Sequence, residues 1–193
     1  MRPETLDFDL CLIKFREDII AEDPDKDVQM ACLAENVPDH GSKCWIAGWG
    51  AEHFTDLWAD SLKQASVTLL ERSYCLANSG YSSSELGPEV ICAGKLDNDG
   101  NGLADGGVDA CNKDFGGPLI CPIEGKAALV GVVSWRKRCA VEGLPGLYSS
   151  VAYPSSYKWI RETVDPATPM TLASNEQTLT FNIILMFALL FLR

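Results

Sequence analysis

Short apolar runs, separated by turn-forming residues, dominate the middle of the chain. Between residues 44 and 152, stretches rich in valine, isoleucine, leucine and alanine alternate with clusters of glycine, proline, asparagine and aspartate. This pattern is typical of an antiparallel barrel, because each strand crosses the core once and then reverses at a turn. The pattern therefore predicts an all-β domain. Its clearest strands are Ser61–Leu70, Val90–Ala93, Pro118–Pro122 and Ala128–Trp135.

The segments on either side depart from this pattern. Residues 5–15 carry closely spaced apolar side chains, which predict a strand buried on both faces. Residues 16–43 are rich in acids and interrupted by prolines, as in a connector. From Tyr153 to Val164 the apolar positions recur at helical spacing, with a proline near the start. This change of period predicts a helix that packs back onto the barrel.

The last part of the chain suggests an association with a membrane. The apolar run Phe181–Leu192 is shorter than the ~20 residues that a membrane-spanning helix needs. It follows a polar stretch, and Ala173-Ser174-Asn175 resembles the small-residue triplet at which a glycolipid anchor is attached. The spacer after that triplet is shorter than the ~8–12 residues expected. Three alternatives stay open: a cleaved anchor signal, another membrane-associated tail, and a tail without such a role.

Composition limits the number of domains, the possible partners and the cellular compartment. With 193 residues the chain is long enough to bury the core of one domain. Its net charge of −11 argues against nucleic acid and anionic lipid surfaces as partners, since phosphate binding needs clustered cations. Eight cysteines indicate an oxidising compartment, outside the cell or at its surface. Met1–Thr5 lacks the apolar run of a secretory signal, so we expect the sequence to be part of a longer secreted protein.

One stretch of the sequence carries specific chemistry. Residues Asp109–Ile120 read Asp-Ala-Cys-Asn-Lys-Asp-Phe-Gly-Gly-Pro-Leu-Ile. They resemble the nucleophile loop of the trypsin-like serine proteases, Asp-Ala-Cys-x-Gly-Asp-Ser-Gly-Gly-Pro-Leu. The resemblance extends over residues 5–163, because further segments match family motifs in the same order. These segments are Asp9–Lys14, Cys44–Gly50, Val90–Gly94, Gly131–Trp135 and Pro145–Tyr148.

The resemblance implies the family's fold, which is all-β, with two six-stranded antiparallel barrels and a C-terminal helix. The second barrel is complete in this sequence, whereas the first is largely missing. The family's catalytic histidine lies upstream of the aspartate that Asp9 matches, and neither His40 nor His53 occupies its place. The expected divisions are a first-barrel remnant with connector at 1–43, the second barrel with its helix at 44–165, a polar stalk at 166–180 and a hydrophobic tail at 181–193.

At the implied catalytic site, the residues needed for acyl transfer are replaced or lack a partner. Phe115 stands where the family keeps the attacking serine, and a benzyl group has neither a lone pair to attack with nor a proton to give up. Lys113 replaces the oxyanion-hole glycine, whose backbone conformation a side chain disfavours. Asp9 has no histidine to orient, so we expect it to bond nearby backbone groups. Asp114 matches the carboxylate that pairs with the new amino terminus of activated members; here it either finds another partner or stays in solvent.

The resemblance also implies a specificity pocket for arginine or lysine. Asp109 matches the carboxylate at its base, whereas Arg136-Lys137-Arg138 stands where the family keeps glycines at the entrance. In one alternative, an arginine folds inward and pairs with Asp109 as a plug, a pair worth about 4 kcal/mol at ~4 Å before desolvation. In the other, the arginines point to solvent and narrow the mouth. The expected pocket residues are Asp109, Ser134, Trp135, Arg136, Arg138 and Gly146.

A glycine- and aspartate-rich segment matches the first half of a calcium-binding loop. Its candidate ligands are Asp97, Asp99, Asn101 and Asp105, which place oxygens on alternate residues. The final position of the pattern, which should be a glutamate, is Val108. A solvated turn and a weak calcium site both stay open, and we expect no other cofactor.

Cysteine spacing alone does not settle which cysteines pair. The resemblance implies three disulfides, each worth roughly 3–4.5 kcal/mol through restriction of the unfolded chain. Cys32 matches a cysteine that ties the family's catalytic domain to an upstream segment. We expect Cys11 to be a buried free thiol, with a Cys11–Cys32 bridge as the alternative. The implied disulfides are Cys44–Cys121, Cys75–Cys92 and Cys111–Cys139.

The leading functional interpretation is a catalytically inactive homologue of the trypsin-like serine endopeptidases that binds a protein or peptide at the cell surface or outside the cell. One alternative is a serine-type endopeptidase by family membership, in a longer form that supplies a histidine but still carries Phe115. The other is a non-functional fragment of a longer protease.

Overall fold

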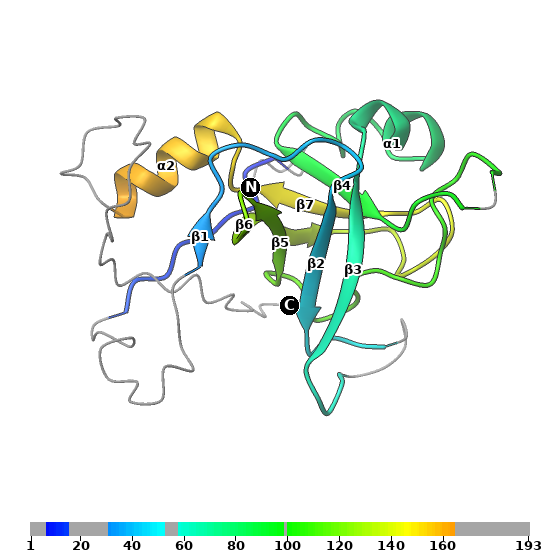
Figure 1. The fold of residues 1–193 in the computed structure, drawn as a ribbon, viewed down its shortest axis with the longest axis horizontal. Helices are drawn as coiled ribbons and strands as arrows, with labels where there is room; N and C mark the ends of the chain where they lie inside the picture. The colour runs from blue at the N-terminus through cyan, green and yellow to red at the C-terminus, as the bar shows by residue number, and fades with distance from the viewer. Residues whose placement is uncertain (1–6, 16–30, 53–57, 99, 165–193) are drawn as a thin grey trace.

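The computed structural model describes residues 7–15, 31–52, 58–98 and 100–164 (Figure 1). Within these ranges, most elements are strands, with one short helix among them and a longer helix after the last strand. The elements are β1 (Cys32–Leu33), β2 (Lys43–Gly48), β3 (Lys63–Leu70), α1 (Arg72–Asn78), β4 (Val90–Gly94), β5 (Pro118–Ile123), β6 (Lys126–Trp135), β7 (Gly146–Ser150) and α2 (Pro154–Val164).

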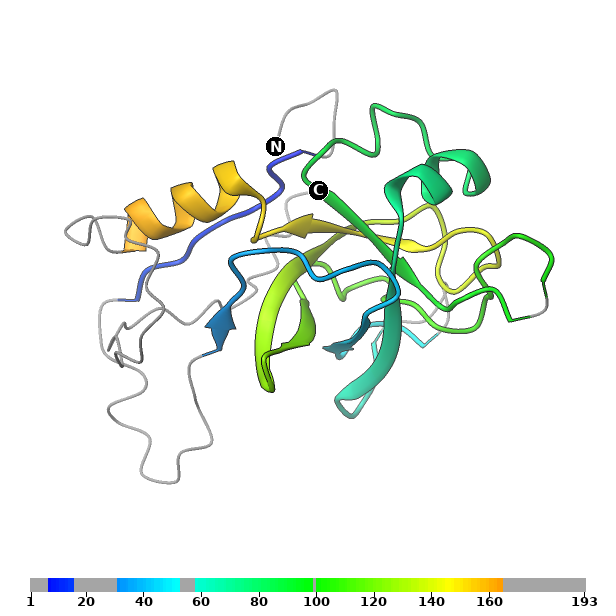
Figure 2. The same cartoon turned by 45° about the horizontal axis from the view of Figure 1, so that its top comes forward.

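The strands form a closed barrel. Its order is β6-β5-β2-β3-β4-β7, and β7 pairs back with β6 to complete the ring. Every pair of neighbours in the ring is antiparallel, whereas the short β1 lies outside it as a parallel partner of β6. The curved wall is visible in Figure 2. The prediction of an all-β fold with a second six-stranded barrel and a C-terminal helix is confirmed.

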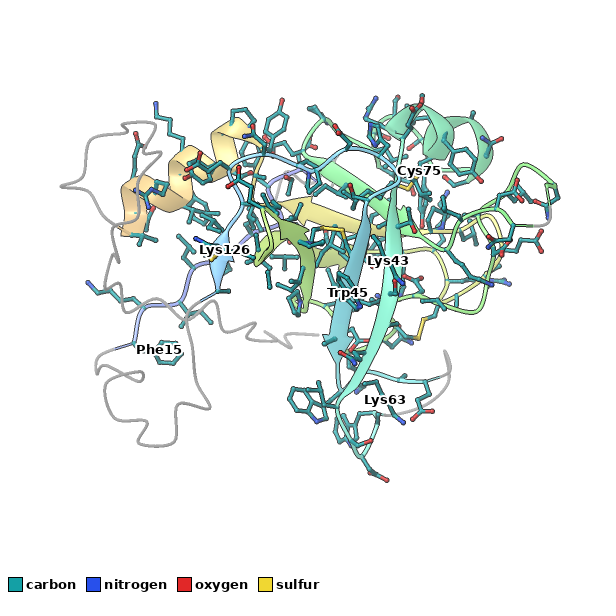
Figure 3. All side chains as sticks on the ribbon, in the orientation of Figure 1. Phe15, Lys43, Trp45, Lys63, Cys75 and Lys126 are labelled. Atoms are coloured by element: carbon teal, nitrogen blue, oxygen red, sulfur yellow. A yellow bond between two sulfur atoms is a disulfide. The ribbon has the colours of Figure 1, made fainter. Side chains whose placement is uncertain are left out.

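The alternation of side chains along β2 shows how the sequence selects this fold. Cys44 and Ile46 are buried in the barrel, while Lys43 and Trp45 beside them are exposed. Successive side chains of a strand point to opposite faces, so this alternation leaves one face to the core and one to solvent. The outward side of the β2–β3 pair carries Lys43 and Trp45, whereas Lys63, the first residue of β3, pairs with Gly48 on the side of Ala65 and Val67 (Figure 3).

The strand β6 is buried over most of its length because both of its faces are covered. One face belongs to the barrel interior, and the other contributes Leu129 and Val132 to a cluster with Ile160 of α2. The predicted helix is therefore confirmed, together with its packing onto the barrel. The short helix α1, which no pattern in the sequence predicted, follows β3 and presents the buried Cys75 to the core.

The described N-terminal residues 7–15 do not form the expected strand. They run alongside α2 without a secondary-structure assignment (Figures 1 and 2). Leu10 and Leu12 pack onto the cluster beneath α2, while Cys11 between them is exposed. The segment is therefore buried on one face and not, as had been expected, on both. Within the described residues it forms no hydrogen-bonded ladder with a neighbouring strand. Its start is held by Glu89, whose carboxylate accepts the Phe8 N–H at 3.2 Å and the Ser155 hydroxyl of α2 at 2.8 Å.

The three expected disulfides are confirmed. Among the described residues, Cys11 and Cys32 are free and exposed, so the expectation of a buried thiol at Cys11 is wrong, and a Cys11–Cys32 bridge is not formed. The physical reason is that Leu10 and Leu12 occupy the buried side of the segment and turn Cys11 outward. The bridges are Cys44–Cys121, Cys75–Cys92 and Cys111–Cys139, with sequence separations of 77, 17 and 28 residues.

The described helices are too short or too polar to cross a membrane. The expected tail at 181–193 and the stalk before it lie outside the described residues, so the proposed lipid anchor stays a prediction.

Candidate functional site

The loop that resembles the nucleophile loop is fastened to the end of β6. Gly116 donates its N–H to the Val133 carbonyl at 2.9 Å, and Val133 donates in return to the Gly117 carbonyl at 2.8 Å. Gly117 has no room for a side chain, because a Cβ there would lie 2.7 Å from the Asp114 carbonyl oxygen. These bonds place Phe115 directly beside the residues that follow β6.

Asp114 finds internal partners rather than staying in solvent. Its carboxylate accepts the Gly50 N–H at 2.8 Å and the Cys111 N–H at 2.9 Å. A Cβ at Gly48 would approach the Asp114 carboxylate to 1.9 Å, and one at Gly50 to 2.3 Å. The Gly-Trp-Gly motif at the end of β2 is therefore required because its two glycines leave space for this carboxylate.

Lys113 keeps a backbone conformation that favours glycine. Its φ of 76° lies in the left-handed region, where a non-glycine residue costs roughly 1–3 kcal/mol. The Lys113 ammonium lies 4.7 Å from the centre of the Trp58 ring. An exposed cation–π contact of this kind returns about 0.5–1 kcal/mol, which offsets only part of the cost. The lysine is thus tolerated at the oxyanion-hole position with residual strain.

Phe115 presents its ring to a guanidinium. The ring centre lies 4.5 Å from the Arg136 guanidinium carbon, and the phenylalanine remains 37% exposed. At the position where the family keeps its nucleophile, the chain therefore places an aromatic platform for a cation.

Asp9 reaches the same region from the N-terminal segment. Its carboxylate accepts the hydroxyl of Ser134 at 2.8 Å, across a separation of 125 residues. The expectation of backbone partners for Asp9 is thus corrected, since the hydrogen bond goes to a side chain of β6 that is itself buried. This bond ties the N-terminal segment to the strand that ends at Trp135.

Asp109, which we expected at the base of the specificity pocket, lies beside Gly146. Its Oδ2 accepts the Ala140 N–H at 3.3 Å, while its buried Oδ1 has no hydrogen-bond partner in the described part of the chain. Burial raises the pKa of this carboxyl to about 7, against the opposing influence of the Ala140 N–H and the Arg136 charge. Gly146 is required beside it, because a Cβ there would lie 2.6 Å from Asp109 Oδ1.

Arg136 does fold inward, but it does not pair with Asp109. Only 6% of the residue is exposed, and burial lowers its pKa. Its Nη2 donates to Asn112 Oδ1 at 3.2 Å, and its Nε donates to Cys139 Sγ at 3.3 Å. No ion pair joins Arg136 to Asp109 within the described ranges, so the ion-pair form of the plug is wrong. Asn112 and the Phe115 ring bind the guanidinium instead.

The neighbouring residues of that segment point elsewhere. Arg138 is exposed, and Trp135 is 42% exposed. The Lys137 ammonium lies 3.6 Å from the Glu85 carboxylate and 4.9 Å from the centre of the Tyr81 ring. Lys137 is thereby turned away from Asp109.

Tyr81 holds the same segment in place. Its hydroxyl donates to the Pro145 carbonyl at 2.9 Å and accepts the Lys137 N–H at 3.4 Å. Burial raises the pKa of Tyr81 to about 12, so the hydroxyl stays a donor at neutral pH. Sequence reasoning missed Tyr81, Asn112 and Trp58, because none of them belongs to a motif that marks chemistry by residue type.

A cavity of about 230 Å³ lies behind the nucleophile-like loop, between it and the β2–β3 pair. The cavity is lined by Ile46, Ala47 and Gly48 of β2 and by the carboxylates Asp109 and Asp114. Lys63, the first residue of β3, also lines the cavity. Its side chain is labelled in Figure 3.

The calcium-loop candidates mostly bond to the loop itself. Asp97 accepts the N–H groups of Gly100 and Gly102 at 2.7 and 2.8 Å. Asp105 pairs with Lys95 at 3.2 Å and accepts hydrogen bonds from Asn98. Asn101 bonds Glu142. The described residues contain no group of three or more His, Cys, Asp or Glu side chains able to hold a metal ion; Asp99 lies outside them. The weak calcium site stays a prediction.

The closed barrel, its three disulfides and the loop Asp109–Ile120 define a barrel of the serine-protease type. The sequence model of the trypsin family matches residues 1–160. The chain therefore belongs to the trypsin family.

Relatives among characterised proteins agree with this assignment. Ovochymase of Halocynthia roretzi is 37% identical over 163 residues, which cover 80% of this chain and 9% of that protein. Human transmembrane protease serine 5 is 35% identical over 158 residues, or 81% of this chain and 32% of the relative. Coagulation factor XII of Sus scrofa is 33% identical over 170 residues, or 83% and 26%. The chain spans no more than about a third of the length of these relatives.

Proposed function

We propose that this chain is a catalytically inactive member of the trypsin family that acts by binding a protein or peptide. The observation that carries the proposal is the stacking of Arg136 on Phe115 at 4.5 Å. This contact puts an aromatic ring at the nucleophile position and a guanidinium at the mouth of the pocket. The site is therefore built around residues that cannot perform acyl transfer.

The base supports the same conclusion, because the described residues supply none. At the oxyanion position, Lys113 keeps the left-handed backbone that a glycine would favour, with a φ of 76° and its side chain over Trp58. No described histidine lies at the site: His40 is exposed in the connector before β2. Asp9 bonds Ser134 rather than an imidazole.

The binding role is supported by exposed aromatic side chains at and near the nucleophile-like loop. Trp58, Phe115 and Trp135 are 63, 37 and 42% exposed, respectively. Large aromatic side chains are the groups that dominate the affinity of protein interfaces. The three disulfides and the names of the relatives, which include a transmembrane protease and a coagulation factor, favour a place outside the cell or at its surface.

Two assays test the proposal. The folded chain should remain unlabelled by a fluorophosphonate probe that labels active trypsin in a parallel control. It should also not cleave peptidyl-arginine amides. Labelling of one residue, located by mass spectrometry, would instead favour the second candidate, a serine endopeptidase. For the binding role, displayed random peptides should be enriched on the folded chain, with at least tenfold weaker binding to Trp135→Ala. Failure to enrich any peptide would count against a binding function.

A further inference from the structure

Arg136 is a buried cation that neutral groups hold in place. Only 6% of the residue is exposed, and its Nη1 has no hydrogen-bond partner among the residues described. Its Nη2 bonds the Asn112 side chain, and the Phe115 ring centre lies 4.5 Å from the guanidinium carbon. Because a buried charge is costly without a counter-ion, an anion formed beside this guanidinium would be stabilised by it.

The remaining guanidinium contact is with a disulfide sulfur. Arg136 Nε donates to Cys139 Sγ at 3.3 Å, and Cys139 is bridged to Cys111. A disulfide sulfur is a weak acceptor, whereas a thiolate is an anion, and hydrogen bonds between charged groups are about twice as strong as neutral ones. The same contact is therefore worth more once the bridge is open than while it is closed.

The other two disulfides differ in both surroundings and exposure. Within the described residues, no lysine or arginine donates to a sulfur of either bridge, and all four of their cysteines are buried. Cys139, in contrast, is half-buried and follows the exposed Arg138, so a small thiol can approach it. The four buried cysteines are Cys44, Cys121, Cys75 and Cys92.

The acids near Arg136 do not already supply the missing anion. Asp109 and Asp114 influence the pKa of Arg136, but neither forms an ion pair with it in the described part of the chain. The Asp114 carboxylate is bound by backbone N–H groups, and burial raises the pKa of Asp109 to about 7. Tyr81 and Tyr148 stay neutral, because burial raises their pKa as well. A thiolate from the bridge would be the anion in direct contact with the guanidinium.

We propose that Cys111–Cys139 is a redox-exchangeable bridge, opened by small thiol reductants and made easier to reduce by Arg136. A dithiol transfers two electrons and becomes a disulfide, while the bond between the two cysteine sulfurs breaks. Of the two protons that the dithiol releases, one goes to Cys111 and one to solvent, which leaves Cys139 as a thiolate beside Arg136. Stabilising the reduced form in this way raises the reduction potential.

Opening the bridge has a structural consequence. The bridge ties the loop that carries Phe115 to the segment 136–139, so reduction removes the covalent link between them. The proposal rests on neither the binding role nor the absence of catalysis, because it uses only the two cysteines and the buried cation.

The test measures the reduced fraction of each bridge at equilibrium in dithiothreitol redox buffers, by alkylation of free thiols and mass spectrometry. Cys111–Cys139 should open at a ratio of reduced to oxidised dithiothreitol at least about tenfold lower than the other two bridges, which corresponds to about 30 mV. Arg136→Gln removes the charge and should raise the ratio needed by about tenfold or more. Arg138→Gln removes an exposed cation next to Cys139 and should leave the ratio unchanged.

A measurement on the wild type keeps the test decisive if Arg136→Gln fails to fold, which its thermal transition would show. With only this bridge open, the rate of alkylation by iodoacetamide against pH should give Cys139 a pKa well below the ~8.5 of a free cysteine, and Cys111 should not share this shift. A Cys139 thiol that titrates at ~8.5 or above would overturn the proposal. So would equal shifts in the two variants, no shift in a folded Arg136→Gln, or a bridge that opens no earlier than the other two.

Discussion

Asp109→Asn should change how the stability of the chain depends on pH. In the folded chain, burial holds the pKa of this carboxyl at about 7, above its usual 3.8. The unfolded chain therefore gives up the proton near pH 4, whereas the folded chain keeps it until about pH 7. Because the folded state binds more protons in this range, the free energy of unfolding must fall as pH rises from about 4 to about 7.

The magnitude follows from the same two values. They differ by about 3 units, and one pKa unit corresponds to about 1.4 kcal/mol. Ionisation of Asp109 thus removes roughly 4 kcal/mol of stability, a loss that is complete above about pH 8 and absent below about pH 4. An asparagine does not ionise, so the variant lacks this loss. Its buried amide adds a constant cost of about 1–3 kcal/mol, which does not vary with pH.

The measurement is urea denaturation followed by tryptophan fluorescence, at intervals from pH 4.5 to 8.5, with the disulfides intact. The stability of Asp109→Asn relative to the wild type should rise by about 3 kcal/mol or more across this range. Asp60→Asn, which alters an exposed carboxylate, should give a curve parallel to the wild type. Parallel curves for Asp109→Asn and the wild type would refute the reasoning, because they would mean that the carboxyl is ionised at little cost in the folded chain.

Three further predictions concern other parts of the site and core. Phe115→Ser supplies a hydroxyl but no base, so the variant should stay unlabelled by a fluorophosphonate; labelling of the introduced hydroxyl, located by mass spectrometry, would contradict this. Gly50→Ala places a Cβ 2.3 Å from the Asp114 carboxyl carbon and should cost about 1–3 kcal/mol in urea denaturation, whereas a loss below about 0.5 kcal/mol would show that the carboxylate moves freely. Replacing both Cys75 and Cys92 by alanine opens a 17-residue separation and should cost about 3 kcal/mol by calorimetry; an unchanged transition temperature would argue against that bridge.

Much of the fold could be predicted because it is encoded locally. Alternation in β2 and the long apolar run of β6 mark strands, and the helical spacing after Tyr153 marks α2. The disulfides followed from motifs whose order in the chain is specific. The helix α1 was missed, since seven residues with one buried side chain give too weak a periodic signal.

The partners of the site residues could not be predicted in the same way. Asp9 bonds Ser134 across 125 residues, and Asp114 bonds Gly50 across 64. The turn of Cys11 toward solvent depends on which neighbours of the N-terminal segment meet α2. Such pairings depend on the closure of the barrel, which brings distant loops to one end.

By itself, the sequence determined which chemical groups this protein possesses: a phenylalanine at the nucleophile position, a lysine where the oxyanion loop favours glycine, and cysteines at family spacings. These are covalent facts, and no folding can supply an oxygen to a benzyl ring. Only the tertiary structure decided which groups contact the Arg136 guanidinium. The side chain turned inward as one alternative predicted, but the Phe115 ring and Asn112 bind it in place of Asp109, because a guanidinium offers both a flat face and several donors and can therefore exchange one set of partners for another.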